Sequence, residues 1–309
     1  MITRHYEKGD EVRIAKLFED VFHQTMNVEQ WKWKYTGQGL HDNKSAVTAN
    51  EEGVIVGHFG GISLRMWFRD RFTIAYQGTD LMLHKNYRGS LNKRGLYFEI
   101  CRFFYENLPS FVYGFINPDH FRLGKLLGFY EDAIVVNDHR IDTTSHLMPV
   151  YSLERMEWDN RKIDSLWNKV YKGLGWSIVR DREFLKWRYE SNPLHSYRLY
   201  GLRRRFLNEI LGWVVVREGE ESELLLTDMI CKDDYLGSML KKLSSMAYAE
   251  GKKEIVLWLN DRYNKLLHSL GFKSFRRGTY IPNCVWVRRC ETSEMGTQLY
   301  FTMGDADFI

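Results

Sequence analysis

The chain has 309 residues and a formal net charge of +4, with 44% hydrophobic and 27% charged residues. This composition is that of a soluble globular protein, long enough for two domains of ordinary size. Residues 1–150 hold 18 basic and 18 acidic side chains, so the small positive excess falls in the second half. Such a weak charge argues against the concentrated basic face of a nucleic-acid-binding protein.

Membrane, secretion and metal signals are absent from the sequence. No apolar run approaches the roughly 18 residues that a membrane-spanning helix needs, and residues 1–10 lack the apolar core of a signal peptide. The four cysteines have no metal-ligand spacing, and Cys101 and Cys231 lie in apolar stretches typical of buried positions. We therefore expect a cytoplasmic protein with no metal, no membrane partner and no nucleic-acid partner.

In the first half, hydrophobic periodicity predicts two helices, then strands, then helices alternating with strands. Pro118 suits the first turn of a helix, and Gly128 is expected to end that helix. In chain order we expect helix 11–24, a helical segment 31–35, strands 45–50, 54–59, 62–68 and 72–82, helix 95–107, strand 111–116, helix 118–127 and strand 133–136.

The pattern restarts after residues 137–158, which carry no strong periodicity and are expected to connect two domains, 1–145 and 146–309. Strong periodicity then resumes with helices and strands in a similar order. We expect helices 163–174 and 181–189, strands 198–202, 210–217 and 223–231, helix 236–249, strand 254–259, helix 262–270, and closing strands 285–289 and 298–302.

Three sequence segments recur in the same order in both halves. The pairs are WKWKY (31–35) with LKWRY (185–189), TDLMLHKNYRGSL (79–91) with TDMICKDDYLGSM (227–239), and INPDHFRLGKLLGF (116–129) with LNDRYNKLLHSLGF (259–272). Their offsets are 154, 148 and 143 residues, measured at the second Trp, the Asp and the last Gly. Three ordered repeats with similar offsets predict a duplicated domain.

The segment 76–97 has the pattern of an anion site. A strand runs to about Leu83, a polar turn containing glycine and arginine follows, and a helix begins near Gly95. Backbone N–H groups of such a loop and the dipole of the following helix favour negative charge. Arg88, Lys93 and Arg94 add cations for phosphate oxygens. The same pattern also fits a basic surface loop in front of a helix.

With YRG at 87–89, a glycine at the helix start, and NP…LGF at 117–129, the chain resembles the GNAT superfamily of acyl-CoA-dependent N-acyltransferases. The resemblance is good over 12–136 and weaker over 163–302, and the loop is longer than the family's Arg/Gln-x-x-Gly-x-Gly/Ala. It implies the α/β class with α+β mixed sheets. Two tandem GNAT-like domains are expected, each a mostly antiparallel mixed sheet flanked by helices, with acetyl-CoA as co-substrate.

The resemblance also implies which residues contact acyl-CoA. The backbone of 82–84 would face the thioester and the pantetheine arm, residues 90–97 would hold the pyrophosphate, and Asn117 would contact pantetheine. The expected coenzyme-binding residues are Met82, Leu83, His84, Arg88, Gly89, Ser90, Lys93, Arg94, Gly95, Leu96, Tyr97 and Asn117.

The second copy lacks these features. It has no arginine and no second glycine in the corresponding loop, and Asp233 and Asp234 stand just before it. Two carboxylates would repel a phosphate. We therefore expect the second copy to be degenerate, with one coenzyme bound per chain.

Direct attack of an amine on a thioester needs a group that takes a proton and a group that stabilises the thiolate. Asp80 and His84, at i and i+4 on one face of a strand, are the candidate bases. Asp228 repeats Asp80, which also fits a structural hydrogen bond. The family often places a tyrosine acid where this chain has Gly124, and the candidate substitutes are Tyr113 on the preceding strand and Tyr87 at the loop.

The predicted function is N-acyl transfer, with acetyl as the expected acyl group, to an amine such as an amino sugar or another small metabolite. One alternative is a non-catalytic acyl-CoA-binding or scaffold protein. Another is an aminoacyltransferase similar to the Fem proteins, which use aminoacyl-tRNA, although the near-neutral first half argues against a tRNA partner.

Overall fold

The computed structural model describes residues 1–36, 43–88, 95–220 and 222–307, and the chain divides into two compact units. The first unit comprises Met1–Met66, Phe72–Ile134 and Thr279–Met295, and the second comprises Trp67–Arg71, Val135–Gly278 and Gly296–Ile309. The chain thus enters each unit more than once, whereas the sequence predicts a single crossing after residue 145.

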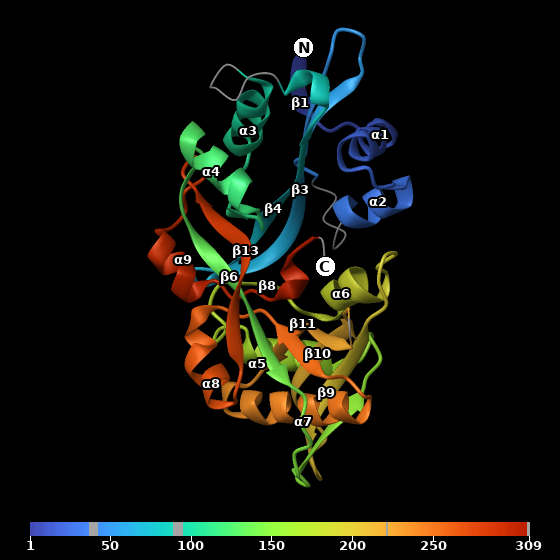
Figure 1. Ribbon diagram of the computed structural model, residues 1–309, viewed down its shortest axis with the longest axis vertical. Helices are drawn as coiled ribbons and strands as arrows, with labels where there is room; N and C mark the ends of the chain where they lie inside the picture. The colour runs from blue at the N-terminus through green and yellow to red at the C-terminus, as the bar shows by residue number, and fades with distance from the viewer. Residues whose placement is uncertain (37–42, 89–94, 221, 308–309) are drawn as a thin grey trace. The chain divides into compact units, whose positions relative to one another are not determined.

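The first unit is a mixed sheet with helices on both faces. Its elements are β1 (Ile2–His5), α1 (Glu11–Phe22), α2 (Val28–Thr36), β2 (Ala46–Ala49), β3 (Ile55–Phe68), β4 (Arg71–Leu83), the 3-10 turn η2 (Lys85–Tyr87), α3 (Leu96–Glu106), β5 (Val112–Tyr113) and α4 (Pro118–Leu127). The strand order is β1–β2–β3–β4–β5, with β4 and β5 parallel. Figure 1 shows α1 and α2 on one side of β3 and β4, and α3 and α4 on the other.

Two adjacent glycines let aromatic side chains pack onto the middle of β3 from both faces. A Cβ atom at Gly60 would lie 2.1 Å from Tyr35 Oη, and a Cβ atom at Gly61 would lie 2.9 Å from a ring carbon of Phe104. Glycine is therefore needed for close approach rather than for a turn. β3 runs unbroken through this point, although the sequence predicts two strands that separate here.

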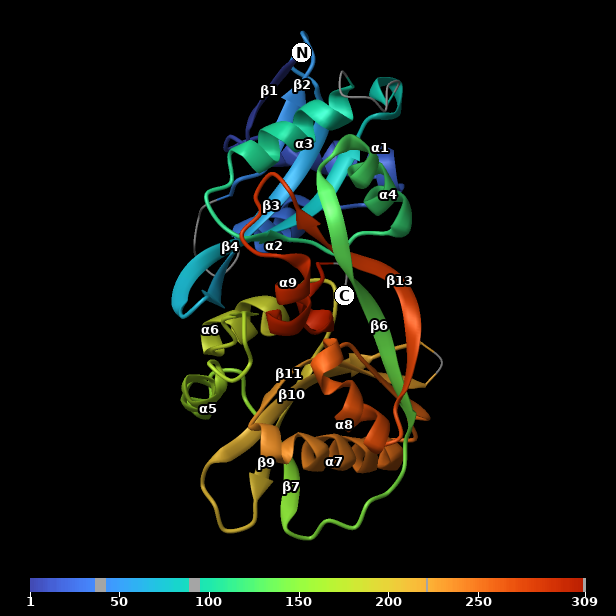
Figure 2. The same ribbon diagram turned by 90° about the vertical axis from the view of Figure 1, so that its left-hand side faces the viewer.

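The second unit is built on a longer mixed sheet. The elements that follow α4 are β6 (Tyr130–Asp142), β7 (Tyr151–Arg155), α5 (Lys162–Val170), β8 (Ser177–Ile178), α6 (Arg182–Leu185), the π-helical turn η3 (Lys186–Glu190), β9 (Arg198–Arg204), β10 (Ile210–Glu218), β11 (Glu223–Cys231), the 3-10 turn η4 (Asp233–Tyr235), α7 (Leu236–Ala249), β12 (Glu254–Leu257), η5 (Asp261–Tyr263), α8 (Asn264–Ser269), β13 (Lys273–Cys284), α9 (Thr292–Gln298) and η6 (Met303–Asp305). The strand order is β13–β6–β12–β11–β10–β9–β7, and β11 and β12 are parallel. Strands β6 and β13, side by side in Figures 1 and 2, each begin in one unit and end in the other.

The predicted fold class, mixed sheets flanked by helices, is confirmed, but the predicted closing strands are wrong. The last strand is β13, and residues 285–289 and 298–302 form no regular strand. β13 escapes prediction because its first five residues are all exposed, so no period of two is visible. It also contains Pro282 and Gly278, the latter at φ +78°, which resemble turn signals.

Candidate active site

Asp80 lies in β4 where the strand departs from regular geometry. Its φ of 45° is in the left-handed region, which costs a non-glycine residue about 1–3 kcal/mol. The carboxylate accepts hydrogen bonds from Lys34 Nζ at 2.8 and 2.9 Å and from Tyr35 Oη at 2.6 Å. The backbone carbonyl of Asp80 accepts another from His58 Nδ1 at 3.0 Å. These donors hold a backbone conformation that is unfavourable by itself.

The same contacts set the protonation state of Asp80. Burial would raise its pKa, but the charge of Lys34 and the hydrogen bonds from Lys34 and Tyr35 outweigh burial and hold the pKa below its usual range. A carboxylate of this kind is a weak base at neutral pH. The arrangement argues against Asp80 as the group that deprotonates an amine, and that role stays a prediction.

The second unit repeats the tyrosine–aspartate contact of the first. Tyr189 Oη donates to Asp228 Oδ2 at 2.7 Å, as Tyr35 Oη does to Asp80. The cation here is Arg180, whose Nε donates to Asp228 Oδ1 at 2.9 Å, and both of these side chains are fully buried. Repetition in both units indicates that the contact supports the fold. The joint recurrence of the tyrosine and the aspartate was the sequence signal for it.

His58 makes a pH-dependent contribution to stability. It is fully buried, and burial lowers its pKa to about 4. An unfolded histidine titrates near pH 6.5, so below that pH the unfolded chain binds a proton that the folded chain does not. The free energy of unfolding therefore decreases as the pH is lowered from 7 to 5. We expect His58 to account for a loss of about 2 kcal/mol between pH 7 and pH 5.

Urea unfolding at the two pH values measures this contribution. His58→Gln should lose about 2 kcal/mol less than the native protein over the interval, because glutamine does not titrate. An equal loss in both proteins would show that His58 does not stay neutral in the folded state.

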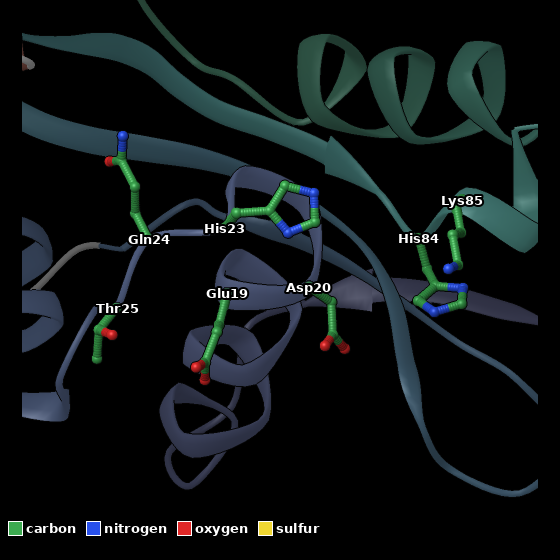
Figure 3. Close-up of a pocket in the computed structure, with 7 residues that line it drawn as sticks. All are labelled: Glu19, Asp20, His23, Gln24, Thr25, His84 and Lys85. Atoms are coloured by element: carbon green, nitrogen blue, oxygen red, sulfur yellow. The ribbon is translucent and has the colours of Figure 1, made fainter.

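His84 follows the last residue of β4 and borders a hollow of about 460 Å³. The hollow is lined by the end of α1, the segment after it and the start of η2, and its residues are Glu19, Asp20, His23, Gln24, Thr25, His84 and Lys85 (Figure 3). In Figure 3, Asp20 and His84 stand on opposite sides of this space. Two carboxylates against the single ammonium of Lys85 leave the hollow with a formal charge of −1, which favours a cationic ligand group.

The hydrogen bonds of His84 indicate which ring nitrogen carries a proton. Nδ1 accepts a hydrogen bond from the backbone N–H of Asn86 at 3.3 Å. The neutral ring then has its proton on Nε2. In this tautomer Nε2–H can donate a hydrogen bond, for example to a departing thiolate, whereas Nδ1, the nitrogen that could take a proton from an amine, is already engaged by Asn86. That His84 acts as the base stays a prediction, and this tautomer does not favour it.

Gly124 stands where the resemblance to the GNAT superfamily would place a tyrosine acid, and a side chain of β6 occupies the space beside it. A Cβ atom at Gly124 would lie 2.1 Å from Cδ2 of Tyr130, so that ring occupies the space. Tyr130 Oη lies 2.9 Å from Tyr105 Oη and 3.3 Å from His120 Nε2. Burial raises the pKa of Tyr130 far above its usual range and lowers that of His120 to about 4. Sequence reasoning missed both residues. The candidate acid Tyr113 lies on β5 with 5% of its surface exposed.

The predicted coenzyme-binding residues at the end of β4 are held by regular packing. The side chains of Met82 and Leu83 are buried, and Arg88 Nε donates to Leu83 O at 2.9 Å. This bond orients the guanidinium at the end of the strand. The other residues expected in this loop, Gly89, Ser90, Lys93 and Arg94, lie outside the described residues.

The remaining predicted coenzyme contacts lie at the starts of α3 and α4. Gly95 is extended (φ −83°, ψ 155°) and is the residue before α3, whose first residues Leu96 and Tyr97 are half-buried. Asn117 is exposed, and its Oδ1 accepts a hydrogen bond from the backbone N–H of His120 at 2.8 Å. Asn117 therefore caps the N-terminus of α4, and this bond fixes the direction of its Nδ2 group.

The two units differ in the segment that joins the 3-10 turn to the next helix. In the first unit Arg88–Gly95 separates η2 from α3, whereas in the second unit α7 begins at Leu236, directly after η4. Asp233 and Asp234 are exposed in η4. The basic, glycine-containing segment therefore belongs to the first unit alone. It also explains why the repeat offset falls from 148 to 143 residues.

In the part of the chain that the structure describes, no group of three or more His, Cys, Asp or Glu side chains is placed to hold a metal ion. No described helix combines the length and the apolar character needed to cross a membrane.

No protein-family model and no curated protein matches this chain. A probable N-acyltransferase from Enterococcus faecalis V583 matches with a TM-score of 0.71 and 12% identity, over 93% of this chain and 73% of that chain. A GCN5-related N-acetyltransferase from Anabaena variabilis ATCC 29413 matches with a TM-score of 0.66 and 13% identity, over 91% and 71%. Saccharomyces cerevisiae N-myristoyltransferase with bound myristoyl-CoA matches with a TM-score of 0.57 and 10% identity, over 91% and 81%. At these identities the likeness establishes the fold, and this chain has the fold of the GCN5-related N-acetyltransferase (GNAT) superfamily.

Proposed function

We propose that the protein is an acyl-CoA-dependent N-acyltransferase, with acetyl as the expected acyl group. The observation that carries the proposal is the basic segment Arg88–Gly95, which stands between β4 and α3 and has no counterpart between β11 and α7. Cations in front of a helix N-terminus suit the phosphates of a coenzyme. The solved N-myristoyltransferase of similar fold holds an acyl-CoA. The second unit is then the degenerate copy.

The hollow beside His84 is the proposed acceptor site, because it adjoins the end of β4 and carries the carboxylates of Glu19 and Asp20. Carboxylates raise the local concentration of a protonated amine, such as an amino sugar or another small amine metabolite. In the reaction the amine nitrogen bonds to the acyl carbon and loses its proton to water. The carbon–sulfur bond breaks, the Nε2–H group of His84 donates a hydrogen bond to the departing thiolate, and the thiolate takes a proton from water.

Calorimetric titration with acetyl-CoA, followed by assays of thiol release with amine acceptors, tests the function. We expect about one coenzyme per chain and amine-dependent release. His84→Ala should lower kcat by about 10²-fold and leave coenzyme affinity unchanged, because removing one hydrogen-bond donor to a developing negative charge costs about 10²–10³-fold. His146→Ala, outside the site, is the control. An unchanged kcat in His84→Ala would remove His84 from the mechanism.

The filled space at Gly124 favours a second candidate, a non-catalytic acyl-CoA-binding protein. Coenzyme binding without thiol release for any amine would support that candidate. Absence of coenzyme binding at millimolar concentration would contradict both and would point to a donor carried on tRNA or on a carrier protein.

A further inference from the structure

Each unit contains a pair of parallel strands in which the pairing ends before the first strand does, and the point where it ends is called the split. The pairing of β4 with β5 ends at Gln77 and Tyr113, and that of β11 with β12 ends at Leu226 and Leu257, whereas β4 runs on to Leu83 and β11 to Cys231. Backbone polar groups beyond such a split need other partners. In the first unit, the proposed coenzyme contacts lie beyond this point.

In the second unit the split holds the C-terminal segment, 296–307. Tyr300 Oη donates to Met229 O, on β11, at 2.6 Å. Asn260 Nδ2, just after β12, donates to Leu299 O at 2.9 Å. The segment therefore bonds to β11 and to the stretch that follows β12, and it belongs to the same compact unit.

Corresponding residues of the two copies differ in burial, as expected if the C-terminal segment covers the split of the second unit. Asn260 corresponds to Asn117 by the offset of 143, yet Asn260 is 1% exposed and Asn117 is exposed. Met229 corresponds to Leu81 by the offset of 148, yet Met229 is 2% exposed and Leu81 is half-buried. The C-terminal segment covers in the second copy the positions that are accessible in the first.

Buried charged groups hold the C-terminal segment in place. Arg180 donates to Asp305 Oδ2 at 2.5 Å, and both side chains are buried. Arg188 Nε donates to Gly304 O at 2.9 Å. A Cβ atom at Gly304 would lie 1.9 Å from Tyr189 Oη, so glycine is needed for this close approach. Displacing the segment would break charge-assisted hydrogen bonds, which are stronger than neutral ones.

We infer that the C-terminal segment is a permanent occupant of the second split and closes that unit to acyl-CoA. The statement about the coenzyme rests on the proposed function, and the closure itself rests on the contacts of the segment. The chain then binds acyl-CoA through its first unit alone. The degenerate copy retains its shape because part of the chain replaces the ligand.

Amide hydrogen exchange on the full chain, with and without acetyl-CoA, tests the inference. The backbone N–H groups of Tyr300, Thr302 and Asp305 donate to Trp176 O, Asp305 Oδ2 and Thr302 O. We expect them to be protected in the free protein, with no change at saturating acetyl-CoA, while protection rises in residues 82–97. Exchange of these amides at the rate of an unstructured peptide, or faster exchange on adding acetyl-CoA, would overturn the inference.

A protected segment with no change anywhere on adding acetyl-CoA would leave the closure intact, and the proposed function would be the part that fails. A pair of variants separates the two further. Tyr300→Phe removes the bond to Met229 and should speed exchange in the segment about fivefold, with coenzyme affinity unchanged. Tyr248→Phe, on an exposed position of α7, should alter neither. Weaker coenzyme binding by a folded Tyr300→Phe protein would place the coenzyme in the second split and contradict the inference.

Discussion

Replacing Asp228 with alanine is expected to lower the free energy of unfolding by about 3–5 kcal/mol, the cost of breaking a buried ion pair from one side. The change removes the carboxylate that accepts from Arg180 at 2.9 Å, from Tyr189 at 2.7 Å and from Thr302 at 2.9 Å. Arg180 is fully buried, so water cannot replace the lost partner. Urea unfolding at pH 7 measures the effect.

A matched control comes from an exposed ion pair of the same unit. Lys169 Nζ donates to Glu209 Oε2 at 2.8 Å, and about half of each side chain is exposed (50% and 42%). Pairs of this kind contribute about 0–1 kcal/mol, so Glu209→Ala should cost no more than about 1 kcal/mol. Equally small losses for the two variants would mean that the buried network around Asp228 does not support the fold.

Elements with strong local signals were predicted with their observed bounds. Pro118 and Gly128 bracket α4, and Gly128 adopts the left-handed conformation (φ 82°) that a helix-ending glycine takes. The helix α7 and the strand β11 also match their predicted bounds, because apolar residues at helical spacing mark α7 and two apolar triplets, 224–226 and 229–231, mark β11. In these segments the local sequence and the tertiary fold favour the same structure.

Other features depend on residues that are distant in sequence. The glycines of β3 read as a break, but they exist for contacts with Tyr35 and Phe104 on neighbouring helices. The partner of Asp80, Lys34, is 46 residues away, and neither residue type signals the pairing. The sequence predicts that Asp80 and His84 share one face of a strand, but β4 ends at Leu83, so His84 lies beyond it, and Asp80 has a φ of 45°. Asp80 is held by Lys34 and Tyr35 of α2, partners that spacing along the strand could not reveal.

The repeated segments were the most informative part of the sequence for the site. They indicated a structural hydrogen bond at Asp80 and Asp228, without naming its partner, and the segment after β4 as the place where the copies differ. They could not reveal the C-terminal segment in the second split, because this segment has no counterpart in the first copy. Its anchoring residues become visible as a group only after the chain has folded.

The double variant Arg88→Ala, Arg94→Ala is expected to weaken acetyl-CoA binding by about 10²–10⁴-fold. A charge-assisted hydrogen bond to a phosphate oxygen, shielded from water, contributes about 1.5–3 kcal/mol, and the variant removes one such donor at each position. Arg88 is already oriented by its bond to Leu83 O at 2.9 Å, so little side-chain entropy is lost on binding. Calorimetric titration at low and high salt measures the effect, which should shrink as salt rises.

The control must change the net charge by the same amount without touching the proposed site. Arg204→Ala with Arg205→Ala does so on exposed positions of the second unit, and coenzyme affinity should stay within about twofold of native because distant charges are screened. A change at Gly237 or Ser238, which lie in the first turn of α7 at the positions that correspond to Gly89 and Ser90, should also leave coenzyme binding intact. If the Arg88 and Arg94 double variant binds as the native protein does, the phosphates are not held by the segment Arg88–Gly95. If the Gly237 or Ser238 variants bind weakly while folded, the second unit is not the degenerate copy. Because these two results bear on different units, they separate an error in the location of the site from an error in the number of sites.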